Sequence, residues 1–360
     1  MPLTDLEKVQ QCTTCLVTGG SSFVGSSIVK RLLSCGHRVH TTSRDVRKLD
    51  TLRQLEGAED RLKVFECDLT QPGSFDAAIK GCTHVFHVAS PVLLNLKKDD
   101  VRKNLLKPAV EGVENVLKSC SAEVSVRRVV LTSSIAAMAG EFWEHGKDHL
   151  ISESDWNLCS SETFMPYRYS KVLAERRAWE IEQQQRTGEN AWSLCVINPG
   201  CPFGPPVLPN STSESVKLCK DMLKGKFRIG FPPIGMPICD VDQLAQAHVV
   251  AAFNEQAKGR YLCAAEGMSL QTLMKQCEEM FEPRRKFVGP PLPKFVTFLG
   301  CKLFNMGPWD FVKVQLHRIP QIDNSKAKAE LMIDFYPGRK SLADMVRAIE
   351  ETELKTKGNI

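Results

Sequence analysis

Tyr167 and Lys171 stand four residues apart in a stretch with a helical pattern, Tyr167 to Glu180. This spacing puts both side chains on one helix face, so the ammonium can lie beneath the phenol. A nearby cation lowers the pKa of a phenol from about 10, which makes proton exchange possible near neutral pH. Tyr-x-x-x-Lys is common by chance, so the pair needs further chemical groups around it. Tyr169 has the wrong spacing to Lys171, and we expect it in packing or at the mouth of a substrate site.

Two serines, Ser133 and Ser134, follow a β-type run from Arg128 to Thr132. Ligands bind at the carboxyl edge of parallel sheets, where such a run would end. A hydroxyl group there can donate a hydrogen bond to a carbonyl oxygen as negative charge develops on it. A serine hydrolase would need Gly-x-Ser-x-Gly around these serines, and the chain does not have it.

A glycine-containing turn, TGGSSFVG at residues 18–25, connects a β-type run directly to a helical pattern. Glycines at such a turn let the backbone approach a pyrophosphate, and the helix N-terminus adds N–H donors and a positive dipole end. A phosphate-binding P-loop would require Lys where Ser26 stands. The turn therefore predicts a dinucleotide site, with Ser22 at a place where glycine is usual.

Arg44 follows the second β-type run, about 20 residues beyond the glycines, where a carboxylate would bind a free ribose 2′-hydroxyl. Arg can bind a 2′-phosphate with paired hydrogen bonds. The sequence therefore favours NADP(H) over NAD(H). Asp45 comes next in the chain and leaves NAD(H) as the alternative.

The elements that would carry these groups alternate between short β-type runs and amphipathic helical stretches up to about residue 200. This alternation predicts right-handed crossovers and an α/β fold, a Rossmann-like doubly wound parallel sheet. The expected strands are Thr14 to Thr18, Arg38 to Thr42, Leu62 to Cys67, His84 to Ala89, Arg128 to Thr132 and Ser193 to Ile197.

Prolines crowd two segments beyond residue 199, and we expect ordered loops there rather than central strands. We divide the chain into a dinucleotide-binding domain at 1–199 and a smaller, mainly substrate-binding lobe at 200–360. Segments near 236–264 are expected to return to the main domain, with Gly259 to Ala264 as one more strand. The prolines are Pro199, Pro202, Pro205, Pro206 and Pro209, then Pro232, Pro233 and Pro237.

Composition excludes several classes of protein. The 360 residues are 42% apolar with a net charge of +5, and the basic residues are scattered, so neither disorder nor a nucleic-acid partner is expected. We find no signal peptide, no transmembrane span and no metal-ligand set around Cys12 and Cys15, and we expect a cytoplasmic protein with reduced thiols. The apolar segment Phe295 to Phe304 is either buried against the protein or docked on a membrane surface.

Taken in order, these motifs resemble an extended short-chain dehydrogenase/reductase. The closest branch is that of dihydroflavonol 4-reductases and cinnamoyl-CoA reductase-like enzymes, within the NAD-dependent epimerase/dehydratase superfamily. The resemblance covers nearly the whole chain. It is carried by TGGSSFVG, Arg44, Asp68-Leu69, His87-Val-Ala-Ser-Pro91, Thr132-Ser-Ser134, Tyr167-x-x-x-Lys171 and Asn198-Pro199, and then by segments 240–248, Gly259-Arg-Tyr261 and Asp323 to Ala327.

The resemblance implies roles for the individual residues. Ser134, rather than Ser133, would orient and polarise the carbonyl, Tyr167 would donate the proton, and Lys171 would lower the pKa of Tyr167 and bind the nicotinamide ribose. Hydride would pass from the nicotinamide to the carbonyl carbon. The cofactor would contact Gly19, Ser22, Phe23, Val24, Gly25, Arg44, Asp68, Leu69, Val88, Ala89, Ser90, Tyr167, Lys171 and Pro199.

Departures from the family pattern bear on the substrate. Ser22 in place of glycine is expected to loosen cofactor binding without abolishing it. The segment Phe164 to Lys171 is not the Asn-Trp-Tyr-Cys-Tyr-Gly-Lys signature of cinnamoyl-CoA reductases, which counts against a CoA thioester. His87 and His248 lie in apolar patterns and are expected to pack rather than to catalyse.

The leading hypothesis is an NADP(H)-dependent reductase of an aldehyde, ketone or dihydroflavonol-like carbonyl compound, acting as a monomer or homodimer. Within the same fold, the alternatives are a nucleotide-sugar epimerase or dehydratase and a sterol-type 3β-hydroxy dehydrogenase. A third alternative, a non-catalytic regulator that senses NADP(H), would have no need of the set Ser134, Tyr167 and Lys171.

Overall fold

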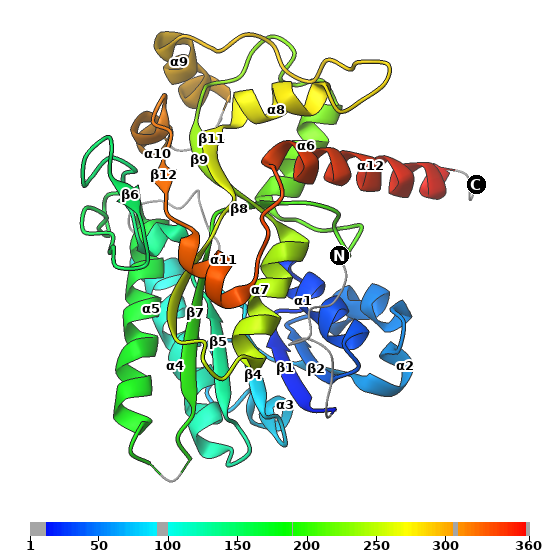
Figure 1. Ribbon diagram of the computed structural model, residues 1–360, viewed down its shortest axis with the longest axis vertical. Helices are drawn as coiled ribbons and strands as arrows, with labels where there is room; N and C mark the ends of the chain where they lie inside the picture. The colour runs from blue at the N-terminus through cyan, green and yellow to red at the C-terminus, as the bar shows by residue number, and fades with distance from the viewer. Residues whose placement is uncertain (1–11, 92–99, 189, 305–308, 358–360) are drawn as a thin grey trace.

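A sheet of seven parallel strands runs through the computed structural model, which describes residues 12–91, 100–188, 190–304 and 309–357 (Figure 1). The strand order is β10-β7-β5-β4-β1-β2-β3, so the chain starts in the middle and winds outward on both sides of β1. This confirms the predicted Rossmann-like, doubly wound sheet. The strands are β1 (Thr14–Thr18), β2 (Arg38–Ser43), β3 (Leu62–Glu66), β4 (His84–His87), β5 (Arg128–Thr132), β7 (Ser193–Pro199) and β10 (Gly259–Cys263).

Helices cover both faces of this sheet. Successive residues of β1 point to opposite sides, since Cys15 and Val17 pack in one core cluster and Leu16 in another. The first cluster includes residues of α1 (Phe23–Ser34) and α7 (Val241–Phe253), and the second those of α4 (Lys107–Ala122) and α5 (Pro166–Gln185). Burial on both faces explains why β1, β5 and β7 are largely apolar along their length.

The C-terminal part of the chain packs above the carboxyl ends of the strands (Figure 1). A three-stranded sheet in the order β11-β9-β8 and the helices α6, α8 and α12 share a third apolar cluster. The elements outside the main sheet and its four large helices are α2 (Ala58–Arg61), α3 (Asp76–Ile79), β6 (Leu150–Ile151), β8 (Cys201–Phe203), α6 (Glu214–Leu223), β9 (Gly235–Asp240), β11 (Glu266–Ser269), α8 (Leu270–Glu278), α9 (Lys294–Phe304), α10 (Trp309–Gln315), β12 (Gln321–Ile322), α11 (Ser325–Leu331) and α12 (Gly338–Lys357).

Each of the two proline-rich segments contains a strand, so the expectation of loops there is wrong in part. Pro202 lies in β8, which is an edge strand. Pro237 lies in β9, but the ladder between β9 and β8 begins only at Ile238. Pro237 therefore has a strand neighbour on one side alone, where a missing N–H costs little.

The segment that follows α7 returns to the main sheet. Strand β10 pairs in parallel with β7, with Arg260 opposite Val196 and Cys263 opposite Pro199. The boundary at residue 199 stays a prediction. None of the helices in the described part of the chain is long and apolar enough to cross a membrane.

The first part of helix α9 is largely exposed, which corrects the expectation that residues 295–299 are buried against the protein. Phe295 is 73% exposed, and Val296, Phe298 and Leu299 are also exposed. Thr297, by contrast, is buried, and its hydroxyl donates to the carbonyl oxygen of Pro293 at 3.1 Å.

Candidate active site

The predicted cofactor residues lie where the strands of the main sheet end. Gly19 follows β1, Arg44 follows β2, Val88 follows β4, Ser134 follows β5, and Pro199 closes β7. Asp68 and Leu69 come just after β3. Because parallel strands end at one edge of a sheet, residues far apart in sequence are brought to one side of the molecule.

The turn from β1 to α1 is tightly closed around Ser22. Its hydroxyl oxygen accepts from the Gly25 amide at 3.0 Å and donates to the Gly19 carbonyl at 2.8 Å, so Ser22 is the N-cap of α1. Gly19 has a φ of +70°, and a Cβ on Gly25 would lie 2.3 Å from the Gly19 carbonyl oxygen. Serine thus fits this turn as a capping residue, and a loosening of cofactor binding stays a prediction.

At the end of β2, the carboxylate that follows Arg44 has a cation of its own. Asp45 accepts from the Arg47 guanidinium at 2.9 and 3.1 Å, and this bond lowers the pKa of Asp45. Arg44 itself is exposed. It lies near Asp68, whose pKa is lowered first by hydrogen bonds from Thr70 and also by the charge of Arg44. The set suits a 2′-phosphate, because Arg44 is exposed while the negative charge of Asp45 is paired with Arg47.

The end of β4 is held by Thr18, which the sequence did not single out. Its hydroxyl oxygen accepts from the amides of Val88 and Ala89, both at 3.0 Å, and therefore donates its own hydrogen to Nδ1 of His87 at 3.0 Å. Burial lowers the pKa of His87 to about 3, so the ring is neutral. His87 is a packing residue that fixes the backbone before Ser90.

The other buried histidine, His248 on α7, is satisfied in the same way. Its Nδ1 donates to the Leu244 carbonyl, and its Nε2 accepts from the hydroxyl of Thr132, both at 2.7 Å. Burial lowers its pKa to about 4. The two histidines thus pack, as their apolar sequence patterns indicate.

The two serines after β5 have different surroundings. Ser133 is buried, and its hydroxyl donates to the Glu175 carboxylate at 2.5 Å. Ser134 is half-buried, and its oxygen accepts from the Ala136 amide at 3.1 Å, which leaves its hydrogen for another acceptor. The geometry therefore agrees with the choice of Ser134 over Ser133.

Helix α5 brings Lys171 to the end of β4. Lys171 is only 7% exposed, and its Nζ donates to the hydroxyl of Ser90 at 3.0 Å. Burial lowers the pKa of Lys171 to about 8, and the charge of Glu175 opposes that shift. Lys171, Ser90, Ser133 and Glu175 also line one narrow pocket between α4, α5 and the sheet.

Tyr167 lies at the start of α5, half-buried against Val101 and Leu105. Burial raises its pKa to about 12, and the charge that opposes this rise is that of Arg168. Desolvation of the phenol outweighs the charge of Arg168, and a lowering of the Tyr167 pKa by Lys171 stays a prediction. At neutral pH the phenol holds its proton.

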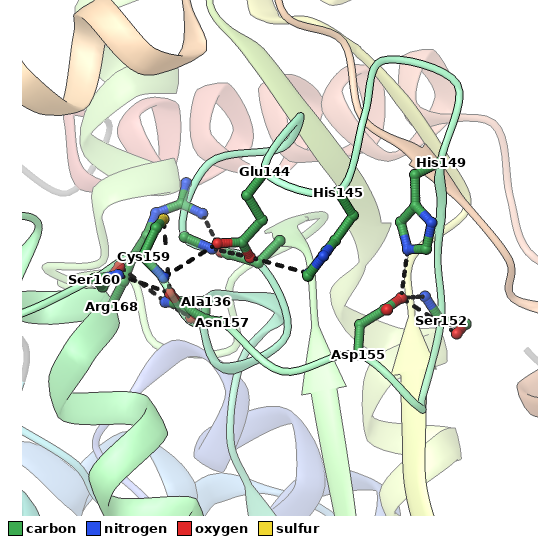
Figure 2. Close-up of polar contacts among 12 residues, drawn as sticks. Ala136, Glu144, His145, His149, Ser152, Asp155, Asn157, Cys159, Ser160 and Arg168 are labelled. Atoms are coloured by element: carbon green, nitrogen blue, oxygen red, sulfur yellow. Dashed lines mark hydrogen bonds and ion pairs between the residues drawn. The ribbon is translucent and has the colours of Figure 1, made fainter.

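Hydrogen bonds connect the loop after Ser134 to the start of α5 (Figure 2). The Glu144 carboxylate accepts from the amides of Gly140 at 3.0 Å and Cys159 at 3.3 Å, and the Asn157 side chain donates to the Ala136 carbonyl at 2.8 Å. Arg168, only 4% exposed, donates to the Ala139 carbonyl at 2.7 Å. Hydrogen bonds thus connect residues 136–168 with one another around Tyr167.

Sequence reasoning missed a buried ionic centre behind the two serines. Glu175 accepts from Arg260 at 2.6 Å and from Asn198 at 2.8 Å, besides Ser133. Its spacing of four residues from Lys171 was the available signal, because it places both on one helix face. Elsewhere in the described ranges, no group of three or more His, Cys, Asp or Glu side chains could hold a metal ion.

A family model described as the 3-beta hydroxysteroid dehydrogenase/isomerase family matches residues 16–264, more than half of the chain. The chain belongs to this family. Anthocyanidin reductase of Arabidopsis thaliana is 37% identical over 316 residues, which cover 81% of this chain and 88% of that protein. Dihydroflavonol 4-reductase of Gerbera hybrida is 32% identical over 316 residues, covering 84% of this chain and 82% of that protein.

Solved structures give the same branch of the family. Gre2 of Candida albicans in complex with NADPH has a TM-score of 0.77 and 29% identity, and the match covers 94% of this chain and 99% of that one. Vestitone reductase from alfalfa has a TM-score of 0.69 and 26% identity, covering 97% and 100%. These comparisons confirm three predictions: the dihydroflavonol-reductase-like branch, the oxidoreductase class and the preference for NADP(H).

Proposed function

We propose that this chain uses NADPH to reduce the carbonyl group of a fairly apolar aldehyde, ketone or dihydroflavonol-like compound to an alcohol. The observation that carries the proposal is the 3.0 Å contact between Lys171 and Ser90. It brings the face of α5 that bears Tyr167 against a strand end on the cofactor side of the sheet. The named relatives, which act on anthocyanidins and dihydroflavonols, support a substrate of this kind.

The strand ends would hold the cofactor as the family pattern implies. The turn from Gly19 to Gly25 would receive the pyrophosphate, and Arg44 the 2′-phosphate. Asp68 and Leu69 would flank the adenine. Val88, Ala89 and Ser90 would line the middle of the cofactor, and Pro199 would lie by the nicotinamide.

The chain's own groups would handle the proton and the carbonyl oxygen. The cofactor, when bound, supplies hydride. Ser134 would donate a hydrogen bond to the carbonyl oxygen, and Tyr167 would give it the proton. With a pKa of about 12, the phenol is in its acid form at neutral pH, as reduction requires. Lys171 would bind the nicotinamide ribose and supply positive charge beside the reacting oxygen.

We also propose a monomer or homodimer in the cytoplasm. The fourteen cysteines are free thiols, which supports a reducing compartment. Contact of Phe295 to Phe304 with a membrane surface stays a prediction. The exposed Phe295 and Leu299 support it, and binding to lipid vesicles would test it.

To test the proposed reduction, the absorbance of NADPH is measured with purified protein and a panel of aromatic and aliphatic aldehydes, ketones and dihydroflavonols. We expect substrate-dependent oxidation of NADPH, with fairly apolar carbonyl compounds the best. A second arm supplies NADP⁺ with 3β-hydroxysteroids, and with sugar nucleotides whose products are separated by chromatography, because epimerases and dehydratases return the hydride to the sugar. Turnover in that arm alone would replace the proposal with the sterol or nucleotide-sugar alternative.

A further inference from the structure

Glu175 lies one helical turn after Lys171 on α5 and is fully buried, with 0% of its surface exposed. A buried carboxylate is costly unless its oxygens are paired. Here both oxygens are engaged. Oε2 accepts from Ser133 at 2.5 Å and from Asn198 at 2.8 Å, and Oε1 accepts from Arg260 at 2.6 Å.

Each of these three donors comes from the end or edge of a different strand. Ser133 follows β5, Asn198 lies near the end of β7, and Arg260 lies in β10. Asn198 also donates to the Ser134 carbonyl at 3.1 Å. One carboxylate therefore connects the helix that bears Tyr167 and Lys171 with the turn that bears Ser134.

Arg260 is held in place independently of Glu175. Its guanidinium lies 4.2 Å from the centre of the Trp156 ring and donates to the carbonyls of Glu153 and Asp155. The Arg260–Glu175 pair is thus anchored at its cationic end. The Glu175 carboxylate is in turn held at a fixed position, one helical turn after Lys171.

The groups around Lys171 make Glu175 its main electrostatic partner. From β4 it faces His87, which is neutral, and the hydroxyl of Ser90. From α4 the lining of the same pocket is apolar, with Ala109, Gly112 and Val113. Burial lowers the pKa of Lys171, and the charge of Glu175 raises it.

We propose that Glu175 is a positioning residue of the active site, which fixes the Ser133–Ser134 turn against α5 and keeps Lys171 in its charged form. The inference rests on the proposed reductase function. Glu175 would touch neither substrate nor cofactor and would act through Ser134 and Lys171. Its loss should therefore change the rate and its pH dependence.

Glu175→Gln keeps the shape of the side chain and removes the charge. An amide offers one oxygen to these donors and to the Trp179 indole, which also donates to Oε1, at 3.4 Å, so at least one donor loses its acceptor. We expect kcat to fall by about 10²-fold, the size of effect that small misplacements of reacting groups produce. Without the anion the pKa of Lys171 should fall further, so the alkaline limb of kcat should lie at lower pH in Glu175→Gln than in the parent.

The matched control is Glu182→Gln, a buried carboxylate further along the same helix that pairs with Arg186 at 2.8 Å. It should leave both kcat and the alkaline limb unchanged. Ser133→Ala gives a second test that keeps the charge of Glu175. It should lower kcat and leave the limb in place. If the alkaline limb of kcat lies at the same pH in Glu175→Gln and in the parent, the electrostatic part of the proposal is overturned.

A readout that needs no turnover separates this inference from the proposed function. Lysine labelled with ¹³C at Cε, with Lys171 assigned from the Lys171→Arg spectrum, should titrate near pH 8 in the parent. The midpoint should lie lower in Glu175→Gln and be unchanged in Glu182→Gln. If no carbonyl compound is reduced, the function fails while this titration still decides the link between Glu175 and Lys171. An unchanged midpoint overturns that link.

Discussion

The cofactor edge and the catalytic face of α5 are built in different ways. At the edge, Ser22 closes its turn through bonds to Gly19 and Gly25, and Asp45 is neutralised by Arg47 two residues away. On α5, Glu175 is satisfied by Ser133, 42 residues away, and by Arg260, 85 residues away. Because the bonds at the cofactor edge are local, a substitution there should disturb one contact at a time. Because the bonds on α5 are long-range, a substitution there should disturb several residues together.

The largest effect is expected from Tyr167→Phe, which removes the proposed acid. Loss of a general acid costs about 10²–10⁴-fold in turnover. The ring remains, so NADPH binding should be unchanged, as a fluorescence titration would measure. Tyr169→Phe is the control and should keep most activity. Full turnover in Tyr167→Phe would remove this residue from the mechanism.

Gly25→Ala tests whether the cofactor edge is intolerant of added bulk. The new Cβ would meet the Gly19 carbonyl oxygen at 2.3 Å and the Ser22 hydroxyl at 2.8 Å. Overpacking of this kind costs about 1–3 kcal/mol, which corresponds to roughly 5- to 150-fold in NADPH affinity if the turn shifts. Gly81→Ala, at a position with a φ of +74° but with open space around its Cβ, should lower Tm and leave the affinity unchanged. Equal affinities in both variants would contradict the steric argument.

Arg44→Ala tests the cofactor edge at a single contact, because only the interaction with the 2′-phosphate should be lost. A hydrogen bond to a charged group contributes about 1.5–3 kcal/mol, so NADPH binding should weaken roughly 10- to 150-fold. NADH binding should hardly change. Arg53→Ala, which removes an exposed guanidinium that pairs with Asp50 at 3.6 Å, is the control. Equal losses for both cofactors would mean that other residues hold the 2′-phosphate.

The smallest effect is a pH dependence of stability. Burial lowers the pKa values of His37, His84 and His248 to about 4 and that of His87 to about 3. Unfolded histidines bind protons near pH 6.5, so between pH 6.5 and 4 the unfolded chain carries more protons than the folded one. The free energy of unfolding should therefore fall as pH falls through this window, as urea melts would show. His248→Asn should reduce the slope, and an equal slope would contradict this account.

The sequence predicted the parts whose signal is local. Strands β1 and β5 have the predicted bounds, and the turn from Thr18 to Gly25 connects β1 to α1 as expected. Apolar runs, glycines and the Tyr–Lys spacing each show themselves within a few residues. These signals were enough for the family branch, the sheet and the cofactor.

The parts that were missed depend on tertiary contacts. Glu175 lies in a charged helix where a solvent-facing carboxylate is the ordinary expectation, and only the fold brings Arg260 to it. Arg168 influences Tyr167 because the loop through Ala139 buries it, which nothing in the letters Tyr-Arg-Tyr indicates. β9 was missed because Pro237 argues against a strand until its one-sided pairing is known.

The pairing of Glu175 with Arg260 joins an early part of the chain to a late one. When residues up to Pro199 have left the ribosome, six strands of the main sheet are present, and the carboxylate at their centre still has no cation from β10. An uncompensated buried charge opposes closure of the core. A chain that stops before Gly259 would therefore have to bury Glu175 without its cation.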